Sequence, residues 1–379
     1  MVVRPAAGGM REHLLALSAG LTAEGHDVEV AAPSRSDVAL AAESAGLRLH
    51  EIPLVGPLHP LYDPRAIASI RRLVRDGRFD LVHAHGFKAG FVGRLGAMLG
   101  GAKAVVVTAH NHVLSRTDTP ASARKRYRSV ERSLAGLVSR YIAVSDSIRS
   151  ELVDGYGLPA ERVVTVHNGV APAPFLAEQD RVAARLQLGL PVGVPAVGLA
   201  ARFSTQKGLR HLIAATPLLR AEMPGIVVVI GGSGPLESEL REQAAALEAT
   251  GSLRWPGQIT DMPRFLSALD VYVSPAETEA LGIALIEAGL AEVPSVATNV
   301  GGVPEVVLDA ETGVLVPPAD PAALAAAVLA LLRDPARARS LAVAARERCL
   351  REFAPELMIE RTLAVYAAAL ASGPEGGRS

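Results

Sequence analysis

The segment from Glu279 to Glu287 carries two carboxylates eight residues apart, so it could hold a ligand at both ends. Apolar residues at helical spacing predict a helix that starts near Glu279 and continues past Glu287. A rise of about 1.5 Å per residue would separate the carboxylates by roughly 12 Å. Glycosidases place their paired carboxylates about 5–9.5 Å apart, so hydrolysis of a glycosidic bond fits poorly. An elongated ligand such as a nucleotide sugar fits better, with the helix N-terminus facing its phosphates.

Two cations, Arg202 and Lys207, follow the first predicted strand of the second half of the chain. Only four of the 38 basic residues are lysines, so a lysine at 207 suggests a compact point charge rather than general solubility. A solvated loop cation is the alternative interpretation. Departure of a nucleoside diphosphate creates negative charge, which cations at this place would stabilise. The sequence has no Asp-x-Asp motif that would bring a metal ion for the same purpose.

Glycines stand at two predicted strand-to-helix turns. Gly8 and Gly9 follow a very short first strand at 1–3, and Gly231–Pro235 follows the run 226–230. Glycine lets the backbone approach a phosphate or a sugar closely. Such pairs are more often ordinary turns, and the second motif lacks the Lys-Ser/Thr of a P-loop.

Three histidines, His83, His85 and His110, end predicted strands, and ligands of parallel sheets bind at that edge. The spacing of His83 and His85 could suggest a metal site. The sequence shows no carboxylate or third ligand beside them, so a role in lining the site is favoured over metal binding.

The composition limits the class of protein. A length of 379 residues is enough for two domains that each bury a core. A net charge of −1 and 4% aromatic residues give no indication of a nucleic-acid partner. One cysteine, Cys349, excludes a disulfide framework, and the absence of a secretory apolar segment favours the cytoplasm. Residues 1–175 are mildly basic, which would suit an anionic acceptor or peripheral contact with the inner face of a membrane.

Short β-branched runs alternate with amphipathic stretches, which is typical of βα units on parallel sheets. Strands are expected at 28–32, 81–84, 104–108, 141–144, 163–166, 196–200, 226–230, 252–256, 271–274, 295–298 and 313–316, and helices at 10–24, 64–75, 89–99, 121–140 and 321–332. We predict an α/β fold of two Rossmann-like, doubly wound parallel-sheet domains facing across a cleft, residues 1–172 and 190–350. A linker with a short helix inside it is expected at 171–195. Residues 351–379 should form a helix that packs on the N-terminal domain, followed by a disordered tail.

The stretch 271–320 resembles the donor-binding half of the retaining GT-B glycosyltransferases of family 4. The shared features are Glu-x7-Glu at 279–287, a proline-bearing strand after it, and Gly-Gly-x-Pro-Glu at 301–305. Ala-Arg-Phe-Ser-Thr-Gln-Lys-Gly at 201–208 resembles the family's Gly-Arg-x4-Lys-Gly motif, with Ala201 in place of the first glycine. The resemblance covers nearly the whole chain and is most specific between residues 196 and 316.

The resemblance implies particular roles in catalysis and in donor binding. Glu279 would contact the sugar or phosphate at the reacting centre, Arg202 and Lys207 would neutralise the diphosphate, and His110 would contact the donor sugar. The remaining donor-binding residues would be Gly8 and Gly9 over the phosphates, Gly234 in a Gly-x-Gly-Pro turn, Ile259 near the base, the Leu281 and Gly282 amides on the diphosphate, and Glu287 on the ribose hydroxyls. Because main-chain groups would read the base, side chains do not reveal whether the donor is a UDP-, GDP- or ADP-sugar.

The implied activity is transfer of a hexosyl group from a nucleotide sugar to a hydroxyl acceptor, with retention of configuration and with no cofactor or metal. The acceptor would be a glycan, a lipid-linked molecule or a small molecule. A nucleotide-sugar 2-epimerase and a catalytically silent nucleotide-sugar-binding protein are the alternatives. Glu292 replaces a helix-ending glycine of the family, and a left-handed backbone there would be strained by about 1 kcal/mol. The basic stretch 122–132 predicts a core-facing amphipathic helix, with docking on a membrane surface as a second interpretation.

Overall fold

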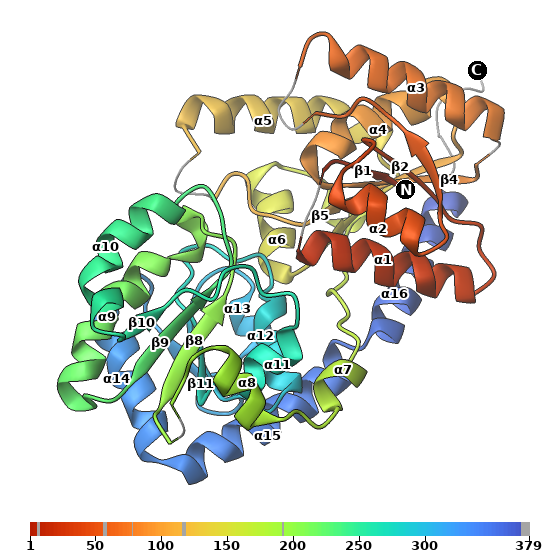
Figure 1. Cartoon of the computed structure of the whole chain (residues 1–379). Coiled ribbons are helices and arrows are strands. Elements are labelled where there is room, and N and C mark those ends of the chain that lie inside the picture. The colour runs from red at the N-terminus through yellow and green to blue at the C-terminus, as the bar shows by residue number, and fades with distance from the viewer. Residues whose placement is uncertain (6–7, 56–58, 78, 116–118, 192, 373–379) are drawn as a thin grey trace. The chain divides into compact units, whose positions relative to one another are not determined.

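The computed structural model describes the chain except residues 6–7, 56–58, 78, 116–118, 192 and 373–379. It divides the chain into two compact units (Figure 1). Unit 1 comprises Met1–Ser115, Thr119–Gly169 and Pro355–Ser379, and unit 2 consists mainly of Val170–Ala354. Among the described residues, no helix is both long enough and apolar enough to cross a bilayer.

Unit 1 is built on a seven-stranded parallel sheet in the order β3-β2-β1-β4-β5-β6-β7. Its strands are β1 (Val2–Val3), β2 (Glu29–Ala32), β3 (Arg48–Glu51), β4 (Leu81–His85), β5 (Ala104–Ala109), β6 (Arg140–Ala143) and β7 (Val163–Thr165). Its helices are α1 (Gly9–Ala23), α2 (Asp37–Ser44), α3 (Tyr62–Gly77), α4 (Gly86–Gly100), α5 (Ala121–Leu134), α6 (Asp146–Ser150) and α16 (Pro355–Ala371), with a π-helical turn η2 (Glu151–Gly155) directly after α6. Although β1 has only two residues, both are buried, and β1 pairs with β2 and β4 at the middle of the sheet.

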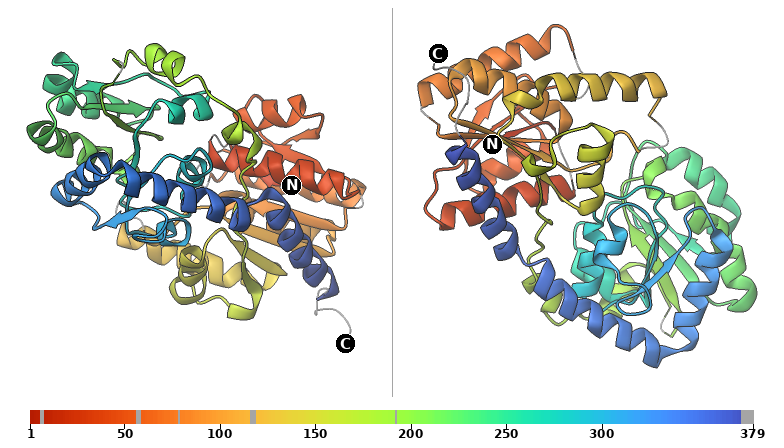
Figure 2. Two further views of the ribbon diagram at one scale, coloured as in Figure 1. Left: turned by 90° about the horizontal axis from the view of Figure 1, so that it is seen from below. Right: turned by 180° about the vertical axis from the view of Figure 1, so that it is seen from behind.

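Unit 2 repeats the scheme with a six-stranded sheet in the order β10-β9-β8-β11-β12-β13. Its strands are β8 (Ala196–Ala200), β9 (Val227–Gly231), β10 (Leu253–Arg254), β11 (Val271–Ser274), β12 (Ser295–Thr298) and β13 (Val314–Val316). Its helices are α7 (Ala173–Leu176), α8 (Arg181–Gln187), α9 (Leu209–Glu222), α10 (Glu237–Ala249), α11 (Met262–Ser267), α12 (Ile283–Leu290), α13 (Val303–Val306), α14 (Pro321–Arg333) and α15 (Pro335–Glu352), with a 3-10 turn at Thr205–Lys207. The two views of Figure 2 show helices flanking the sheet within each unit.

The apolar strand runs explain both sheets, because a parallel strand covered by helices on both faces buries successive side chains regardless of direction. Val227 to Gly231 are all buried, and the predicted strands of both halves lie within a few residues of the observed ones. The predicted doubly wound α/β architecture is therefore confirmed. Strand β3 escaped prediction because its sequence, Arg-Leu-His-Glu, is mostly polar and lies at the sheet edge.

Residues 171–195, the expected linker, contain α7 and α8 and contribute Ala184 and Leu190 to the hydrophobic core of unit 2.

Two expectations about the helix at 121–140 need correction. The helix expected at 121–140 ends at Leu134, and a 3-10 turn separates it from β6. The helix was expected to bury an apolar face. The side chain that it buries is instead that of Glu131, which pairs with the buried Arg94 at 2.8 Å.

Helix α16 packs against α1 and the sheet of unit 1. Leu17 and Leu21 of α1 share a core with Met358 and Val365 of α16. A Cβ on Gly20 would lie 2.0 Å from the Ile359 side chain, so glycine at this position permits the close approach of the two helices. Apart from Ser372, the tail expected to be disordered lies outside the described residues.

Candidate functional site

Three loops at the carboxyl ends of β8, β9 and β11 are joined by backbone hydrogen bonds. The Phe203 N–H donates to the Ser233 carbonyl (2.8 Å), and the Phe203 carbonyl accepts from the Leu236 N–H (3.2 Å). The Gln206 carbonyl accepts from the Glu277 N–H (2.8 Å), which joins the β8 loop to the β11 loop. Because β9, β8 and β11 are adjacent in the sheet, the three loops form one edge, where ligands of such sheets bind.

Glycines allow two of these loops to pack backbone against backbone. A Cβ on Gly232 would lie 1.9 Å from the Ala201 carbonyl oxygen, and a Cβ on Gly234 would lie 2.5 Å from that of Phe203. Both residues also have a positive φ, 123° and 158°. The Gly-x-Gly pattern therefore has a packing reason, and the role of Gly234 toward a donor stays a prediction.

The loop connections bring two predicted catalytic residues together. The Lys207 ammonium donates to the Glu279 carboxylate at 2.5 Å, across 72 positions of sequence. The Lys207 side chain is 34% exposed and the Glu279 side chain 14%, so this ion pair lies at the surface of the edge rather than in the core. Arg202 is exposed and forms no hydrogen bond or ion pair with any residue that the structure describes. A full positive charge on the same loop is thus available to an anionic ligand.

The start of α12 differs from the prediction. Gly282, in the left-handed region at φ 98°, is the N-cap, and the helix runs over Ile283–Leu290. Glu279 lies in the preceding loop, where its carbonyl accepts from the Gly302 N–H (3.0 Å). The roughly 12 Å helical spacing of the two carboxylates was therefore wrong, because only Glu287 is on the helix.

The N-terminus of α12 presents unused hydrogen-bond donors. The N–H groups of residues 281–284 donate to no other residue in the part of the chain that the structure describes. Free amides at a helix start carry partial positive charge and bind anions. The predicted diphosphate contacts, Leu281 and Gly282, are two of these four residues.

The charges of Glu279 and Glu287 both act on Tyr272 of β11. Its hydroxyl donates to the Ala200 carbonyl at 3.5 Å. Burial raises the pKa of Tyr272 far above its usual value, and the charges of Glu287 and Glu279 raise it further. The ring therefore contributes a neutral hydroxyl, and Glu287, half-buried in the second turn of α12, contributes a carboxylate.

The left-handed backbone anticipated at Glu292 is present. The residue has φ 51° and follows Ala291, the C-cap of α12, and its carboxylate pairs with Arg346 at 2.7 Å. The ion pair joins α12 to α15, so the strained backbone is accompanied by a contact that glycine could not make.

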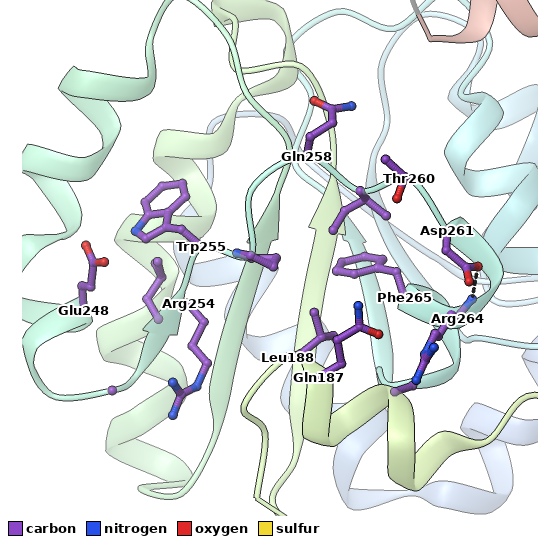
Figure 3. Close-up of a pocket in the computed structure, with 15 residues that line it drawn as sticks. Gln187, Leu188, Glu248, Arg254, Trp255, Gln258, Thr260, Asp261, Arg264 and Phe265 are labelled. Carbon is purple, nitrogen blue, oxygen red and sulfur yellow. Dashed lines mark hydrogen bonds between the residues drawn. The ribbon is translucent and has the colours of Figure 1, made fainter.

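A cavity of about 410 Å³ lies along edge strand β10 (Figure 3). Trp255, Phe265 and Leu188 supply apolar walls, and Arg254 and Gln258 supply polar ones. Of the predicted donor-binding residues, only Ile259 lines this cavity, so it does not coincide with the edge that holds Lys207 and Glu279. Ile259 also packs against Gly231, where a Cβ would lie 2.5 Å from its side chain.

In unit 1, Gly8 and Gly9 form the start of α1. Gly8 is the N-cap with φ 62° and ψ −140°, and its carbonyl accepts from the Arg11 N–H (2.9 Å). A Cβ on Gly8 would meet nothing within 4 Å, so the backbone conformation alone favours glycine there.

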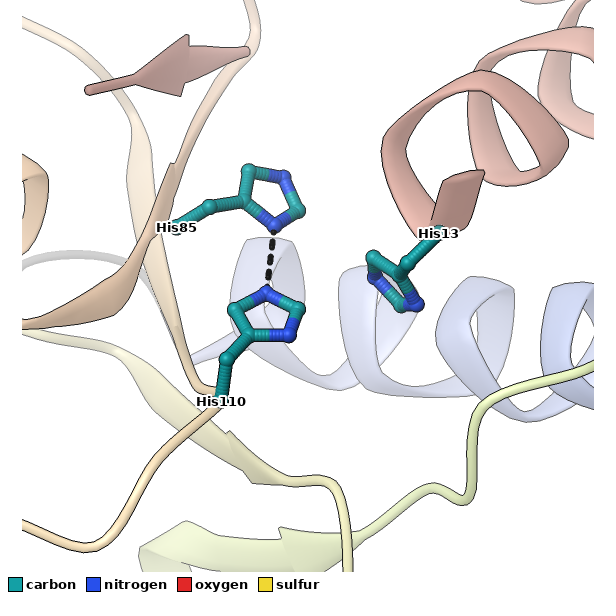
Figure 4. A group of neighbouring side chains, drawn as sticks. All are labelled: His13, His85 and His110. Carbon is teal, nitrogen blue, oxygen red and sulfur yellow. Dashed lines mark hydrogen bonds between the residues drawn. The ribbon is translucent and has the colours of Figure 1, made fainter. Parts of the chain in front are cut away.

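His110 belongs to a buried group of histidines at the carboxyl edge of the unit 1 sheet (Figure 4). The Nδ1 of His85 lies 3.1 Å from the Nε2 of His110, and the ring of His13 on α1 lies 4.8 Å from that of His110 between centroids. The expectation that no third ligand accompanies His83 and His85 was wrong for His85, because His13 and His110 lie beside it. Sequence reasoning missed His13 because it lies inside a helix and ends no strand. Its position four residues after the Gly8-Gly9 turn was the available signal.

The four histidines of this region, His13, His83, His85 and His110, are uncharged at neutral pH. Burial lowers the pKa of His13 to about 4 despite an opposing contribution from Asn168. Burial also lowers the pKa of each of the other three well below the usual value, and the neighbouring histidines add to the effect. Neutral imidazoles donate and accept hydrogen bonds, so His110 could contact a sugar hydroxyl but would not supply positive charge.

The loop after His110 is held by one carboxylate that sequence reasoning missed. Glu151, the first residue of η2, accepts from the N–H groups of Val113 (2.7 Å), Leu114 (3.0 Å) and Ser115 (3.0 Å) and lies 2.9 Å from the Nδ1 of His112. Burial opposes its ionisation, but the hydrogen bonds outweigh burial and lower the pKa of Glu151 to about 2. These contacts span 36 or more positions of sequence, so no local pattern revealed them.

Two family models match the chain. The model for glycosyl transferases group 1 matches residues 180–348, which lie within unit 2. The model for glycosyltransferase family 4 matches residues 7–173, nearly all of them in unit 1.

Curated relatives are similar over most of their length. The alpha-maltose-1-phosphate synthase of Mycolicibacterium smegmatis is 32% identical over 309 residues, covering 76% of this chain and 78% of the relative. The phosphatidyl-myo-inositol mannosyltransferase of the same species is 31% identical over 333 residues, covering 86% of this chain and 82% of the relative. Among solved structures, Anabaena HepE in complex with UDP-glucose matches with a TM-score of 0.83 at 20% identity, covering 97% of this chain and 99% of that one.

Proposed function

The chain belongs to the glycosyl transferases of group 1, family 4, and is a glycosyltransferase with the GT-B fold; we propose that it moves a hexosyl group from a nucleoside diphosphate sugar to a hydroxyl acceptor with retention of configuration. One observation carries this proposal. At a single edge of unit 2, the Lys207–Glu279 pair and the exposed Arg202 accompany a helix start with four unused amides. A diphosphate is the ligand chemistry that uses the two cations and the amides together. The solved HepE complex with UDP-glucose supports this donor class.

The geometry suggests how the leaving group is stabilised. As the bond from the sugar to the diphosphate breaks, negative charge grows on the phosphate oxygen. Lys207, held by Glu279, and the amides at 281–284 are fixed before the reaction, so little reorganisation is needed when that charge appears, and Arg202 adds a further positive charge. These groups supply the positive charge that a metal ion supplies in other transferases, and we propose metal-independent transfer on that basis.

Retention requires the acceptor oxygen to approach the face from which the diphosphate leaves. Glu279 is ion-paired with Lys207, which lowers its reactivity as a nucleophile. We therefore propose that the acceptor hydroxyl attacks as the sugar–phosphate bond breaks, and that its proton passes to the departing phosphate oxygen. Glu287 would meanwhile hold the ribose hydroxyls, as a carboxylate can accept two hydrogen bonds.

The relatives named above support neither alternative raised from the sequence, the 2-epimerase or the silent binding protein.

The stereochemical outcome tests this mechanism directly. Because the acceptor is not identified, water serves as the acceptor, and UDP-, GDP- and ADP-hexoses are offered in turn with EDTA present. Proton NMR of the released sugar, recorded before mutarotation, should show the anomeric configuration of the donor. A released sugar of inverted configuration, or hydrolysis that stops in EDTA and returns with Mg²⁺, would contradict the proposal.

A further inference from the structure

We propose that His13, His85 and His110 form a binding site in unit 1 for one zinc-like divalent ion, held by three imidazole nitrogens (Figure 4). One ligand atom from each residue lies within 4.8 Å of the others. The three side chains come from α1, β4 and the end of β5, and they are 4%, 0% and 8% exposed. The site lies wholly within unit 1, and it goes beyond the proposed transfer reaction.

Two of the nitrogens already have a suitable separation. Nitrogen ligands lie about 2.0–2.1 Å from a tetrahedral zinc ion, so two of them are about 3.4 Å apart. The Nδ1 of His85 and the Nε2 of His110 are 3.1 Å apart, joined by a hydrogen bond that the ion would replace. His13 would have to approach these two by about 1.4 Å from the 4.8 Å limit, which is within reach of a side-chain rotation.

Unsatisfied buried atoms at the same place point to a missing partner. Among the described residues, neither ring nitrogen of His13 has a hydrogen-bond partner of good geometry, although the Asn168 side chain lies close enough to raise its pKa. Buried polar atoms without partners are costly and rare, so two on one ring need a physical explanation. A bound ion would explain them, because it would accept the lone pair of a His13 nitrogen that has no hydrogen-bond donor among the described residues.

The three imidazole ligands indicate which metal ions the site would bind. Three imidazoles without a carboxylate suit Zn²⁺, Co²⁺, Ni²⁺ or Cu²⁺ rather than Mg²⁺ or Ca²⁺, which prefer oxygen. His83 is not a fourth ligand, because its Nδ1 and Nε2 lie 2.6 Å from the Tyr366 hydroxyl and the Thr108 hydroxyl. Three protein ligands leave one tetrahedral position open, as in zinc sites that bind a water or another small ligand.

Occupancy of this site would affect the enzyme in a definite direction. The family resemblance assigns His110 to the donor sugar, so an ion held by its ring would compete with that contact. The transfer reaction would therefore need no metal, and zinc bound at the histidines would inhibit it.

Direct metal titration tests the site without relying on activity. Chelator-treated full-length protein is titrated with ZnCl2 by calorimetry and with CoCl2 by visible absorption. We expect one ion per chain, the strong visible band of four-coordinate cobalt, and no binding of MgCl2 under the same conditions. His13→Gln should weaken zinc binding at least tenfold, and His85→Gln, on a different element, should do the same if the first variant does not fold.

The exposed His26, on the same unit, provides a matched control, because His26→Gln should leave zinc binding unchanged. Absence of zinc binding by the wild type, or equal binding by wild type and both cluster variants, would overturn the proposal. Stabilisation by nucleotides, measured on the same preparations, reports separately on unit 2. Failure of the transferase proposal is thereby distinguished from failure of the metal site.

Discussion

Replacing Lys207 by alanine should lower turnover of the donor by about 10²–10³-fold, with a smaller effect on KM. The ammonium group lies beside Glu279 at the edge that presents the free amides of α12, where the proposed mechanism puts the charge that grows on the leaving diphosphate. Loss of the ammonium also leaves the Glu279 carboxylate unpaired, and this negative charge would repel the diphosphate. Initial rates of donor hydrolysis over a range of donor concentrations separate the two kinetic parameters.

Lys103→Ala is the matched control for Lys207→Ala. Lys103 forms a comparable ion pair with Asp80 at 2.6 Å but lies on the surface of unit 1, so turnover should be unchanged. Lys207→Arg should restore little activity, because a planar guanidinium does not reproduce a compact ammonium. Turnover by Lys207→Ala within a factor of three of the wild type would contradict the proposal that Lys207 stabilises the leaving diphosphate.

Replacing Glu151 by glutamine should destabilise unit 1 by about 3 kcal/mol at pH 7, since a pKa lowered from 4.5 to about 2 corresponds to that free energy. The ionised carboxylate accepts the N–H groups of Val113, Leu114 and Ser115, whereas an amide group presents donors to some of them. The folded-state pKa lies below the unfolded-state value. The stabilisation is therefore complete above about pH 4.5 and is lost as the pH falls toward 2.

Urea unfolding at several pH values checks the Glu151 prediction. The difference in unfolding free energy between wild type and Glu151→Gln should be constant from pH 7 to about pH 5 and should shrink below that. Donor hydrolysis at pH 7 should also fall, because the loop held by Glu151 begins directly after His110. Glu161→Gln, an exposed change in the same unit, should alter neither quantity. A difference that is the same at pH 7 and pH 3 would show that ionisation of Glu151 does not hold the loop.

Sequence and structure agree where burial alone determines the element. Runs such as 196–200 and 271–274 were placed correctly because a strand covered on both faces buries nearly every consecutive side chain, which favours a short, continuous apolar run. The start of α12 was placed three residues too early. The apolar periodicity extends backwards past Gly282, and only the left-handed conformation of that glycine shows where the helix begins.

Contacts between distant segments were beyond sequence reasoning. Glu151 and the amides it accepts, and His13 beside His85 and His110, come from different elements, and no periodicity connects them. The Lys207–Glu279 contact could be anticipated only through the family resemblance, which assigned Glu279 to the reacting centre and Lys207 to the diphosphate beside it. Residue types thus indicated which groups could act, and the sheet topology determined which of them meet.

Nucleotide binding in unit 2 is the most direct test of the account. Thermal unfolding is recorded with UDP, GDP and ADP, each with and without EDTA, for wild type, Glu287→Ala and the control Glu311→Ala, an exposed carboxylate in the same unit. One nucleotide at about 100 times its Kd should stabilise the wild type by about 3 kcal/mol, seen as a raised Tm that EDTA does not change. The shift should persist in Glu311→Ala and disappear in Glu287→Ala. A wild type that none of the three nucleotides stabilises, or a Glu287→Ala variant that responds as the wild type does, would contradict the assignment of the donor site.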